Sequence, residues 1–340
     1  MLSKKNSMSR RTFIKNSLVG TTTLAYMSAT KLPAAQTKLS LLRLGGPTFE
    51  KFDGPDTWVN VVKKLGYNAA YCPVGAGEKD DVVNAYALAA QKADIIIAEV
   101  GAWSNPISPD EKTRRQALAK CRRQLALADR IGANCCVNIS GSRGKLWAGP
   151  SPENLTEETF DMIVETTRAI IDDVKPTRTY FTLEAMPWAY PDSSDSYLRL
   201  LKAIDRRRFA VHLDPVNLIC SPQRYFKNGQ LIRECFRKLG PYIKSCHAKD
   251  ILMSTKLTTH LDEVRPGLGA LDYATFLREL SKFPRTPLML EHLPNAEEYH
   301  LAATHIRSVA KTIGLVSALV GAEPAVARKA RAAARKPEVR

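Results

Sequence analysis

No pair of cysteines in this sequence is separated by two residues, although the 340-residue chain contains seven cysteines. The sequence therefore argues against a zinc ribbon or a dithiol redox site of the usual spacing. A chain of this size does not need disulfides to fold. Four cysteines lie in apolar runs of strand character, where a free thiol packs as a small apolar residue: Cys72, Cys135, Cys136 and Cys246.

Acidic residues are fewer than basic ones, with 34 Asp and Glu against 50 Lys and Arg and a net charge of +16. The two ends of the chain hold much of this excess. Residues 1–35 contribute +6 and residues 322–340 contribute +4, which leaves +6 for the middle of the chain. The middle has no basic patch interleaved with aromatic residues, so a nucleic-acid partner is not expected.

A long apolar run is also missing from the N-terminus. Residues 9–15 read SRRTFIK, the pattern of a twin-arginine export signal, and residues 17–29 are too short and too polar a stretch to span a bilayer. We expect residues 1–35 to be a signal peptide that is recognised by the twin-arginine translocase, and we expect a periplasmic location. An uncleaved anchor is the alternative. Residues 317–340 form a basic tail that lacks large apolar residues and is expected to be disordered.

Between these ends the sequence alternates strand-like runs with helical patterns. One helix is expected from an N-cap at Ser108 to Ile131, with apolar residues at helical spacing. Eight strand-like runs are present, at 39–45, 67–74, 94–102, 134–141, 179–185, 209–215, 242–248 and 287–292. This count and size predict a single (β/α)8 barrel over residues 36–316. An open doubly wound sheet is the runner-up, but a GxGxxG turn after the first strand is missing.

Four polar residues lie at the ends of the last four predicted strands. They are Glu184, Asp214, His247 and Glu291. In one parallel barrel these side chains would meet at the C-terminal mouth, where barrel enzymes hold their catalytic groups. Three carboxylates and one imidazole suit a divalent metal ion, with manganese favoured and magnesium, cobalt or zinc as alternatives. Without a cation, burying three carboxylates would cost several kcal/mol per charge.

The segments LEAMPW, HLDPVN, CHAKD, RPGLGALDY and LMLEHL resemble the sugar phosphate isomerase/epimerase superfamily of xylose isomerase-like barrels. The resemblance implies that Glu184, Asp214, His247 and Glu291 hold one metal ion. It also implies that Glu184 and Glu291 act as acid and base beside a substrate carbonyl, through a metal-stabilised enediolate. The expected enzyme is thus a sugar isomerase or epimerase, and family members often form homodimers.

The chain departs from the ketose 3-epimerases that it resembles. Asn217 stands where they usually carry a histidine, and Ala248-Lys249-Asp250 replaces a segment with a glutamate and an arginine. Simple ketose epimerisation is therefore in doubt. Glu99 could support the metal site or fill the barrel. Seven residues are candidates for substrate contacts: Trp103, Asn138, Trp188, His212, Asn217, Lys249 and Arg265.

Three other functions compete with the isomerase. A lyase or hydratase of 3-keto-glycosides would use the same metal and base, because the proton beside the ring ketone is acidic. An abasic-site endonuclease shares the barrel but needs more histidines than the six present here. A sugar-binding barrel without catalysis would not need two opposed glutamates.

Overall fold

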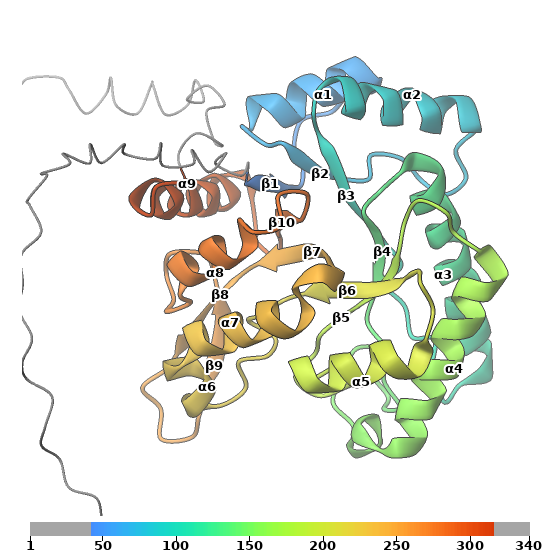
Figure 1. The fold of residues 1–340 in the computed structure, drawn as a ribbon, viewed down its shortest axis with the longest axis vertical. Coiled ribbons are helices and arrows are strands. Elements are labelled where there is room, and N and C mark those ends of the chain that lie inside the picture. The colour runs from blue at the N-terminus through green and yellow to red at the C-terminus, as the bar shows by residue number, and fades with distance from the viewer. Residues whose placement is uncertain (1–41, 316–340) are drawn as a thin grey trace, which may run out of the picture. The chain divides into compact units, whose positions relative to one another are not determined.

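Eight parallel strands close into a barrel in the computed structural model, which describes residues 42–315 (Figure 1). The predicted signal peptide and basic tail lie outside the described residues. Around the barrel the strand order is β1-β10-β7-β6-β5-β4-β3-β2. The barrel strands are β1 (Arg43–Gly46), β2 (Ala69–Tyr71), β3 (Ile96–Gly101), β4 (Cys135–Asn138), β5 (Phe181–Glu184), β6 (Phe209–Leu213), β7 (Ile243–Ala248) and β10 (Pro287–Leu290).

Helices follow the strands and surround the barrel (Figure 1). They are α1 (Pro55–Lys64), α2 (Asp80–Lys92), α3 (Glu111–Ile131), α4 (Glu157–Val174), α5 (Ser194–Ile204), α6 (Pro222–Phe226), α7 (Asn228–Leu239), α8 (Tyr273–Leu280) and α9 (Ala296–Thr312). Two short 3-10 helices are η1 (Pro152–Leu155) and η2 (Gly240–Tyr242). Within residues 42–315, none of the helices is long and apolar enough to cross a membrane.

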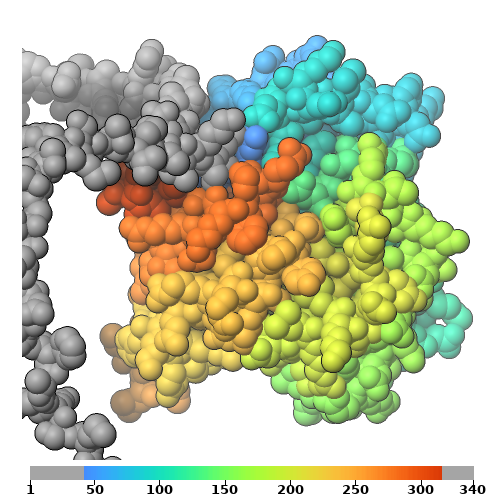
Figure 2. Space-filling view, in the orientation of Figure 1, coloured from blue at the N-terminus to red at the C-terminus, as the bar shows by residue number. Residues whose placement is uncertain are grey.

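The single (β/α)8 barrel predicted from the sequence is confirmed. Seven of the eight observed strands lie inside their predicted runs, whereas β1 ends at Gly46, one residue beyond its run; residues 39–41 of that run are outside the described part. The closing pair is β1 with β10, the first and last strands of the barrel, so blue and orange parts of the chain lie side by side (Figure 2). Because all eight strands are parallel, their C-terminal ends meet at one mouth.

Small side chains allow the strands to close. Ala69, Ile96, Ala98 and Met289 form an apolar cluster made of strand residues alone, apart from the core between strands and helices. Gly45 is required on β1, because a Cβ there would lie 2.5 Å from the carbonyl oxygen of Ala69 on β2. The barrel interior is therefore filled by side chains.

The long helix α3 begins later than the sequence suggested. Asp110, and not Ser108, is its N-cap, and the Asp110 carboxylate accepts a hydrogen bond from the backbone N–H of Thr113. The Ser108 hydroxyl instead accepts a bond from the backbone N–H of Asp110. Both residue types favour the N-cap, so only the backbone path decides between them.

The segment after β7 contains a hairpin in a region where no strand was predicted. Strands β8 (Asp250–Met253) and β9 (Leu261–Val264) pair antiparallel, with Asp250 opposite Val264. Glu263 on β9 reaches the barrel mouth, where its carboxylate lies 3.6 Å from Lys249 Nζ. The hairpin thus adds a wall to one side of the mouth.

Asp129, in the last turn of α3, fixes the segment that leads into β5. Its carboxylate accepts hydrogen bonds from the backbone N–H groups of Thr177 (2.8 Å), Arg178 (2.6 Å) and Thr179 (3.0 Å). Burial acts to raise the pKa of Asp129, but these donors outweigh burial and lower it. The ionised carboxylate therefore stabilises the fold at neutral pH.

We expect Asp129→Asn to lower the free energy of unfolding by about 1–2 kcal/mol at pH 7, since a neutral amide is a weaker acceptor than a carboxylate. A carboxylate with a lowered folded-state pKa contributes stability above its unfolded pKa of about 4, and this contribution is lost as the pH falls through the folded value. Urea unfolding of both proteins should give a difference that shrinks from pH 7 to about pH 3. An unchanged difference would contradict this role for the charge.

Candidate metal centre and active site

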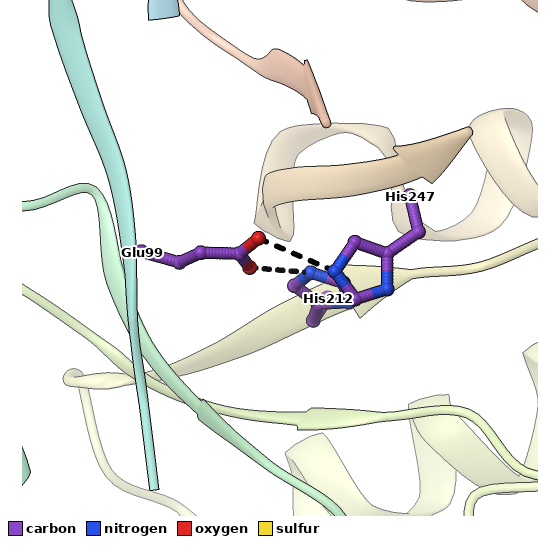
Figure 3. Close-up of side chains that lie close together, drawn as sticks. All are labelled: Glu99, His212 and His247. Carbon is purple, nitrogen blue, oxygen red and sulfur yellow. Dashed lines mark hydrogen bonds and ion pairs between the residues drawn. The ribbon is translucent and has the colours of Figure 1, made fainter. Parts of the chain in front are cut away.

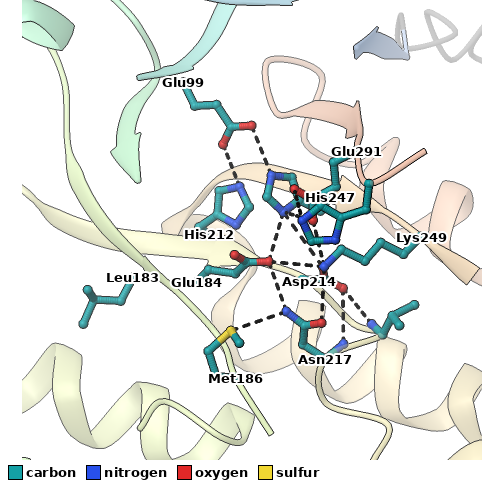
Figure 4. A network of polar contacts seen from close by, with 12 residues as sticks. Glu99, Leu183, Glu184, Met186, His212, Asp214, Asn217, His247, Lys249 and Glu291 are labelled. Carbon is teal, nitrogen blue, oxygen red and sulfur yellow. Dashed lines mark hydrogen bonds and ion pairs between the residues drawn. The ribbon is translucent and has the colours of Figure 1, made fainter. Parts of the chain in front are cut away.

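The four residues at the ends of the last barrel strands meet at the mouth. Glu184 ends β5, Asp214 follows β6, His247 lies on β7 and Glu291 follows β10. Each offers one possible ligand atom, and these atoms lie within 4.8 Å of one another (Figure 4). The spatial cluster that the sequence predicted is therefore present.

His247 lies at the centre of this cluster. Its Nδ1 is 3.0 Å from Glu184 Oε1, 2.8 Å from Glu291 Oε1 and 3.9 Å from Asp214 Oδ2. The Asp214 carboxylate is fixed from behind, because its Oδ1 accepts hydrogen bonds from the backbone N–H groups of Val216 and Asn217. Its Oδ2 is thereby directed into the cluster.

Lys249, two residues after His247, brings a buried ammonium group to the same point. Its side chain is 3% exposed, and Nζ lies 2.9 Å from Asp214 Oδ2 and 2.8 Å from Glu291 Oε1. In the metal-free protein, Lys249 and His247 are the cations that balance the clustered carboxylates.

The electrostatics of the cluster follow from burial and crowding. Burial, with the charges of the two glutamates, raises the pKa of Asp214 to about 6 against the opposing effects of Lys249 and His247. Burial also acts to raise the pKa of Glu184 and of Glu291, but the charge and hydrogen bond of His247, together with the charge of Lys249, outweigh it and lower both. The same glutamates hold the pKa of His247 well above its usual value, against the effect of burial.

The donor set fits a divalent metal ion. Asp214 Oδ2 and Glu291 Oε1 are buried and accept no hydrogen bond, although Lys249 forms ion pairs with both. Buried oxygens without hydrogen bonds are costly unless a cation satisfies them. Three carboxylates and one imidazole are ligands for Mn²⁺, Mg²⁺ or Zn²⁺. Metal binding would displace the Nδ1 proton of His247, because a ligand nitrogen must be deprotonated.

Glu99 on β3 connects the metal-ligand candidate His247 to a second buried histidine (Figure 3). Its carboxylate lies 3.2 Å from His247 Nε2 and 2.7 Å from His212 Nε2. Burial acts to raise the pKa of Glu99, but the two histidines lower it to about 2. An ionised carboxylate only accepts, so both Nε2 atoms carry a proton. This fixes Nδ1 of His247 as the atom that faces the cluster.

We expect Glu99→Gln to weaken Mn²⁺ binding about 10–100-fold. A glutamine has one acceptor oxygen for two histidine donors, so His247 can shift its proton to Nδ1 and lose its free lone pair. Isothermal titration of metal-free protein with Mn²⁺ measures the effect. Glu298→Gln, which removes a half-buried carboxylate that pairs with Arg265, is the control and should bind Mn²⁺ as the unaltered protein does. Equal affinity in all three proteins would contradict the positioning role.

The cluster opens into a cavity of about 640 Å³. Three of the seven predicted substrate contacts line it: Trp103, Asn217 and Lys249. Asn217 also donates a hydrogen bond to Glu184 Oε1 at 3.1 Å, and the Trp103 ring lies 6.4 Å from the His247 ring, between centroids. These residues are therefore placed to contact a ligand bound at the cluster.

The other four predicted contacts do not line this cavity: Asn138, Trp188, His212 and Arg265. Asn138 is fully buried and exchanges hydrogen bonds with the backbone of Ser104. His212 is also fully buried and bonds to Glu99, while Arg265 pairs with Glu298. Asn138, His212 and Arg265 are thus bonded to partners within the protein, whereas Trp188 is half-buried in the loop after β5.

The glycines of the RPGLG segment bind a carboxylate of the protein itself. The backbone N–H groups of Gly267 and Gly269 donate to the buried Asp250 carboxylate, at 2.9 Å and 3.1 Å. A Cβ at Gly269 would lie 2.4 Å from Asp250 Oδ1, so glycine is required there. The segment holds the hairpin against the barrel.

Sequence reasoning missed several residues of the cavity. Glu263 and His292 face each other across it, with His292 Nδ1 3.0 Å from Glu263 Oε1. Tyr71 and Trp147 also line the cavity, and the Tyr71 hydroxyl donates a hydrogen bond to the carbonyl of Leu290 at 3.1 Å. Glu263 and Trp147 lie in segments without strand or motif signals, whereas His292 and Tyr71 stand beside predicted strand ends and could have been considered.

Comparison with known families gives one match. The family model described as "Xylose isomerase-like TIM barrel" matches residues 59–309. This range contains all four residues of the candidate metal centre. A comparison with curated proteins finds no match.

Three similar solved structures have the same fold at low sequence identity. A D-psicose 3-epimerase with D-tagatose, from Clostridium cellulolyticum H10, is 16% identical with a TM-score of 0.58, covering 81% of this chain and 99% of that chain. A xylose isomerase-like TIM barrel protein from Mycobacterium smegmatis, in complex with magnesium, is 16% identical with a TM-score of 0.56, covering 83% and 98%. A probable 3-DHS dehydratase from Bacillus anthracis is 16% identical with a TM-score of 0.56, covering 77% and 95%.

Proposed function

Because this chain belongs to the xylose isomerase-like TIM barrel family, we propose that it is a divalent-metal-dependent isomerase or epimerase of a sugar or keto-sugar. The observation that carries the proposal is the approach of two glutamates to one point from different sides of the mouth. Glu184 and Glu291 extend from β5 and β10, which β6 and β7 separate in the barrel order. Both carboxylates nevertheless lie within 3.0 Å of His247 Nδ1.

This arrangement supports proton transfer beside a carbonyl. Both glutamates have a lowered pKa and are ionised at neutral pH, so each can accept a proton. One glutamate removes a proton from the carbon beside the carbonyl, and the other returns a proton on the opposite face or at the neighbouring carbon. A divalent ion held by Glu184, Asp214, His247 and Glu291 would polarise the carbonyl and a neighbouring hydroxyl. Manganese is the ion that we favour.

Lys249 contributes a fixed positive charge to this chemistry. Its Nζ lines the cavity beside the cluster, and the surrounding carboxylates keep its pKa above the usual value although burial opposes them. When the proton leaves carbon, negative charge develops on the substrate oxygens. A buried ammonium beside those oxygens stabilises that charge more strongly than water does.

Proton exchange followed by NMR tests the proposal. Mn²⁺-loaded protein is incubated in D₂O with ketoses and 3-keto-glucosides. Deuterium that enters a substrate beside its carbonyl, with formation of a new isomer, would support an isomerase or epimerase. The absence of exchange across the panel, with Mn²⁺ binding intact, would count against the proposal.

A carbon–oxygen lyase of 3-keto-glycosides is the second candidate. The specific observation is His292, which lies on the cavity wall 3.7 Å from Glu291 and has a raised pKa because Glu263 accepts its hydrogen bond. A protonated imidazole beside the base could protonate a leaving group after proton removal. The similarity to a probable dehydratase is compatible with this chemistry. Release of an aglycone or of water in the same NMR experiment would favour the lyase.

A further inference from the structure

The loop after β4 presents two large apolar side chains to solvent. Leu146 is 68% exposed and Trp147 is 48% exposed. The base of this loop is nevertheless rigidly held. Ser142 and Asn154 are fully buried, and both donate hydrogen bonds to the carbonyl of Gly149, at 2.8 Å and 3.0 Å. The tip therefore stands in a defined position with a tryptophan that the protein itself does not cover.

The cavity has two chemically different walls. Its charged and polar wall comes from β5, β6, β7 and β10 and from the β8–β9 hairpin, and it contains the metal-ligand candidates. The apolar wall comes from the neighbouring strands β2 to β5 and the loops that follow them, and it contains Tyr71, Trp103, Ile139, Trp147 and Met186. A ligand in this cavity thus meets charged groups on one side and aromatic faces on the other.

The two tryptophans of the apolar wall are more exposed than the metal-ligand candidate His247. His247 is fully buried, Trp103 beside it is 36% exposed, and Trp147 is 48% exposed. The cavity volume of about 640 Å³ lies within the range of pockets for drug-sized ligands, roughly 300–1,000 Å³. A cavity of this size has room for a ligand larger than one sugar ring, and Trp147 is part of its lining.

We propose that Trp147, with Trp103, forms an outer subsite for a second ring, so that the substrate is a glycoside that carries a ketone on its sugar ring. The inference rests on the proposed function, which places the carbonyl at the carboxylate cluster. In a glycoside the anomeric carbon is locked as an acetal, so the carbonyl beside the transferred proton must be a ring ketone. The aglycone, or a second sugar, then stacks on the indole of Trp147.

Binding of two matched probes tests the subsite. Methyl 3-keto-β-glucoside and phenyl 3-keto-β-glucoside are titrated into the Mn²⁺-loaded protein by calorimetry. The phenyl compound is expected to bind about tenfold more tightly, and Trp147→Ala is expected to abolish this difference while the affinity for the methyl compound stays unchanged. Leu146→Ala is the control, because Leu146 is on the same loop and does not line the cavity.

The outcomes separate the subsite from the proposed function. Equal binding of the two probes, a phenyl preference that survives Trp147→Ala, or no binding of either probe would overturn the subsite. Proton exchange in D₂O is measured on the same samples. A phenyl preference that depends on Trp147 without any exchange would support the subsite and count against the isomerase. Exchange without a phenyl preference would support the isomerase and count against the subsite.

Discussion

Replacing Glu291 with glutamine is expected to lower the rate of substrate proton exchange by about 10²–10⁴-fold. Glutamine keeps the size of the side chain and an oxygen that can still face the cluster, but it cannot accept a proton from carbon. The substitution also removes the ion pairs of Glu291 Oε1 with His247 Nδ1 and Lys249 Nζ, each at 2.8 Å, which is why metal binding to the variant is measured as well. The rate of deuterium incorporation, measured by NMR with Mn²⁺-loaded protein, gives the effect directly.

Two measurements make this result specific. Mn²⁺ binding to the Glu291→Gln protein is measured by calorimetry, and exchange is followed at a saturating Mn²⁺ concentration, so a weakened metal site is not mistaken for a lost base. Glu297→Gln removes an exposed carboxylate six residues away, at the start of α9, and should leave the exchange rate unchanged. If the Glu291→Gln protein exchanged protons at half the normal rate or faster, Glu291 would not be the base.

Replacing Lys249 with methionine should destabilise the metal-free protein by about 3–5 kcal/mol, as loss of one partner of a buried ion pair does. The Lys249 ammonium is 3% exposed and lies within 2.9 Å of Asp214 and Glu291 carboxylate oxygens. Methionine fills a similar volume but leaves these carboxylates with His247 as their nearest cation. Urea unfolding in the presence of EDTA measures the loss.

The same variant should regain stability when Mn²⁺ is added. A divalent ion neutralises the carboxylates that form ion pairs with Lys249 in the unaltered protein. A ligand that binds only the folded protein also stabilises it. The difference between the two proteins is thus expected to be smaller in Mn²⁺ than in EDTA. Lys64→Met, which removes one partner of an exposed ion pair with Glu50, should change neither value measurably. An equal loss in EDTA and in Mn²⁺ would show that Lys249 does not share the site with the metal.

The sequence was sufficient for the fold and for the residues of the candidate metal centre. Strand-like runs at regular spacing predicted eight parallel strands, and parallel strands bring their C-terminal ends together in any closed barrel. Glu184, Asp214, His247 and Glu291 could be grouped for this reason, since position along a strand fixes position at the mouth. Glu99 was recognisable as an acid within an apolar strand, although its two histidine partners were not.

The sequence could not assign the substrate-facing residues. Whether a residue contacts substrate depends on the direction of its side chain and on its distance from the cavity. Asn138, His212 and Arg265 are polar residues close to strand ends or motifs, as Asn217 and Lys249 are. In the structure Asn138 bonds to the Ser104 backbone, His212 to Glu99 and Arg265 to Glu298. Asn217 and Lys249 instead line the cavity. The sequence around Trp147 carries no signal of its position, because hydrogen bonds such as those of Ser142 and Asn154 to Gly149 hold its loop.

By itself, then, the sequence determined the barrel and the four residues that meet at its mouth. Hydrophobic periodicity is a local property that identifies each strand, and parallel strands of a closed barrel all end at the same mouth. Only the tertiary structure decided which polar groups remain free for a ligand and which are already hydrogen-bonded within the protein. The tertiary structure also placed the Lys249 ammonium in the cluster, and it divided the cavity into a charged and an aromatic wall. These features depend on contacts between segments far apart in the chain, and no local pattern specifies them.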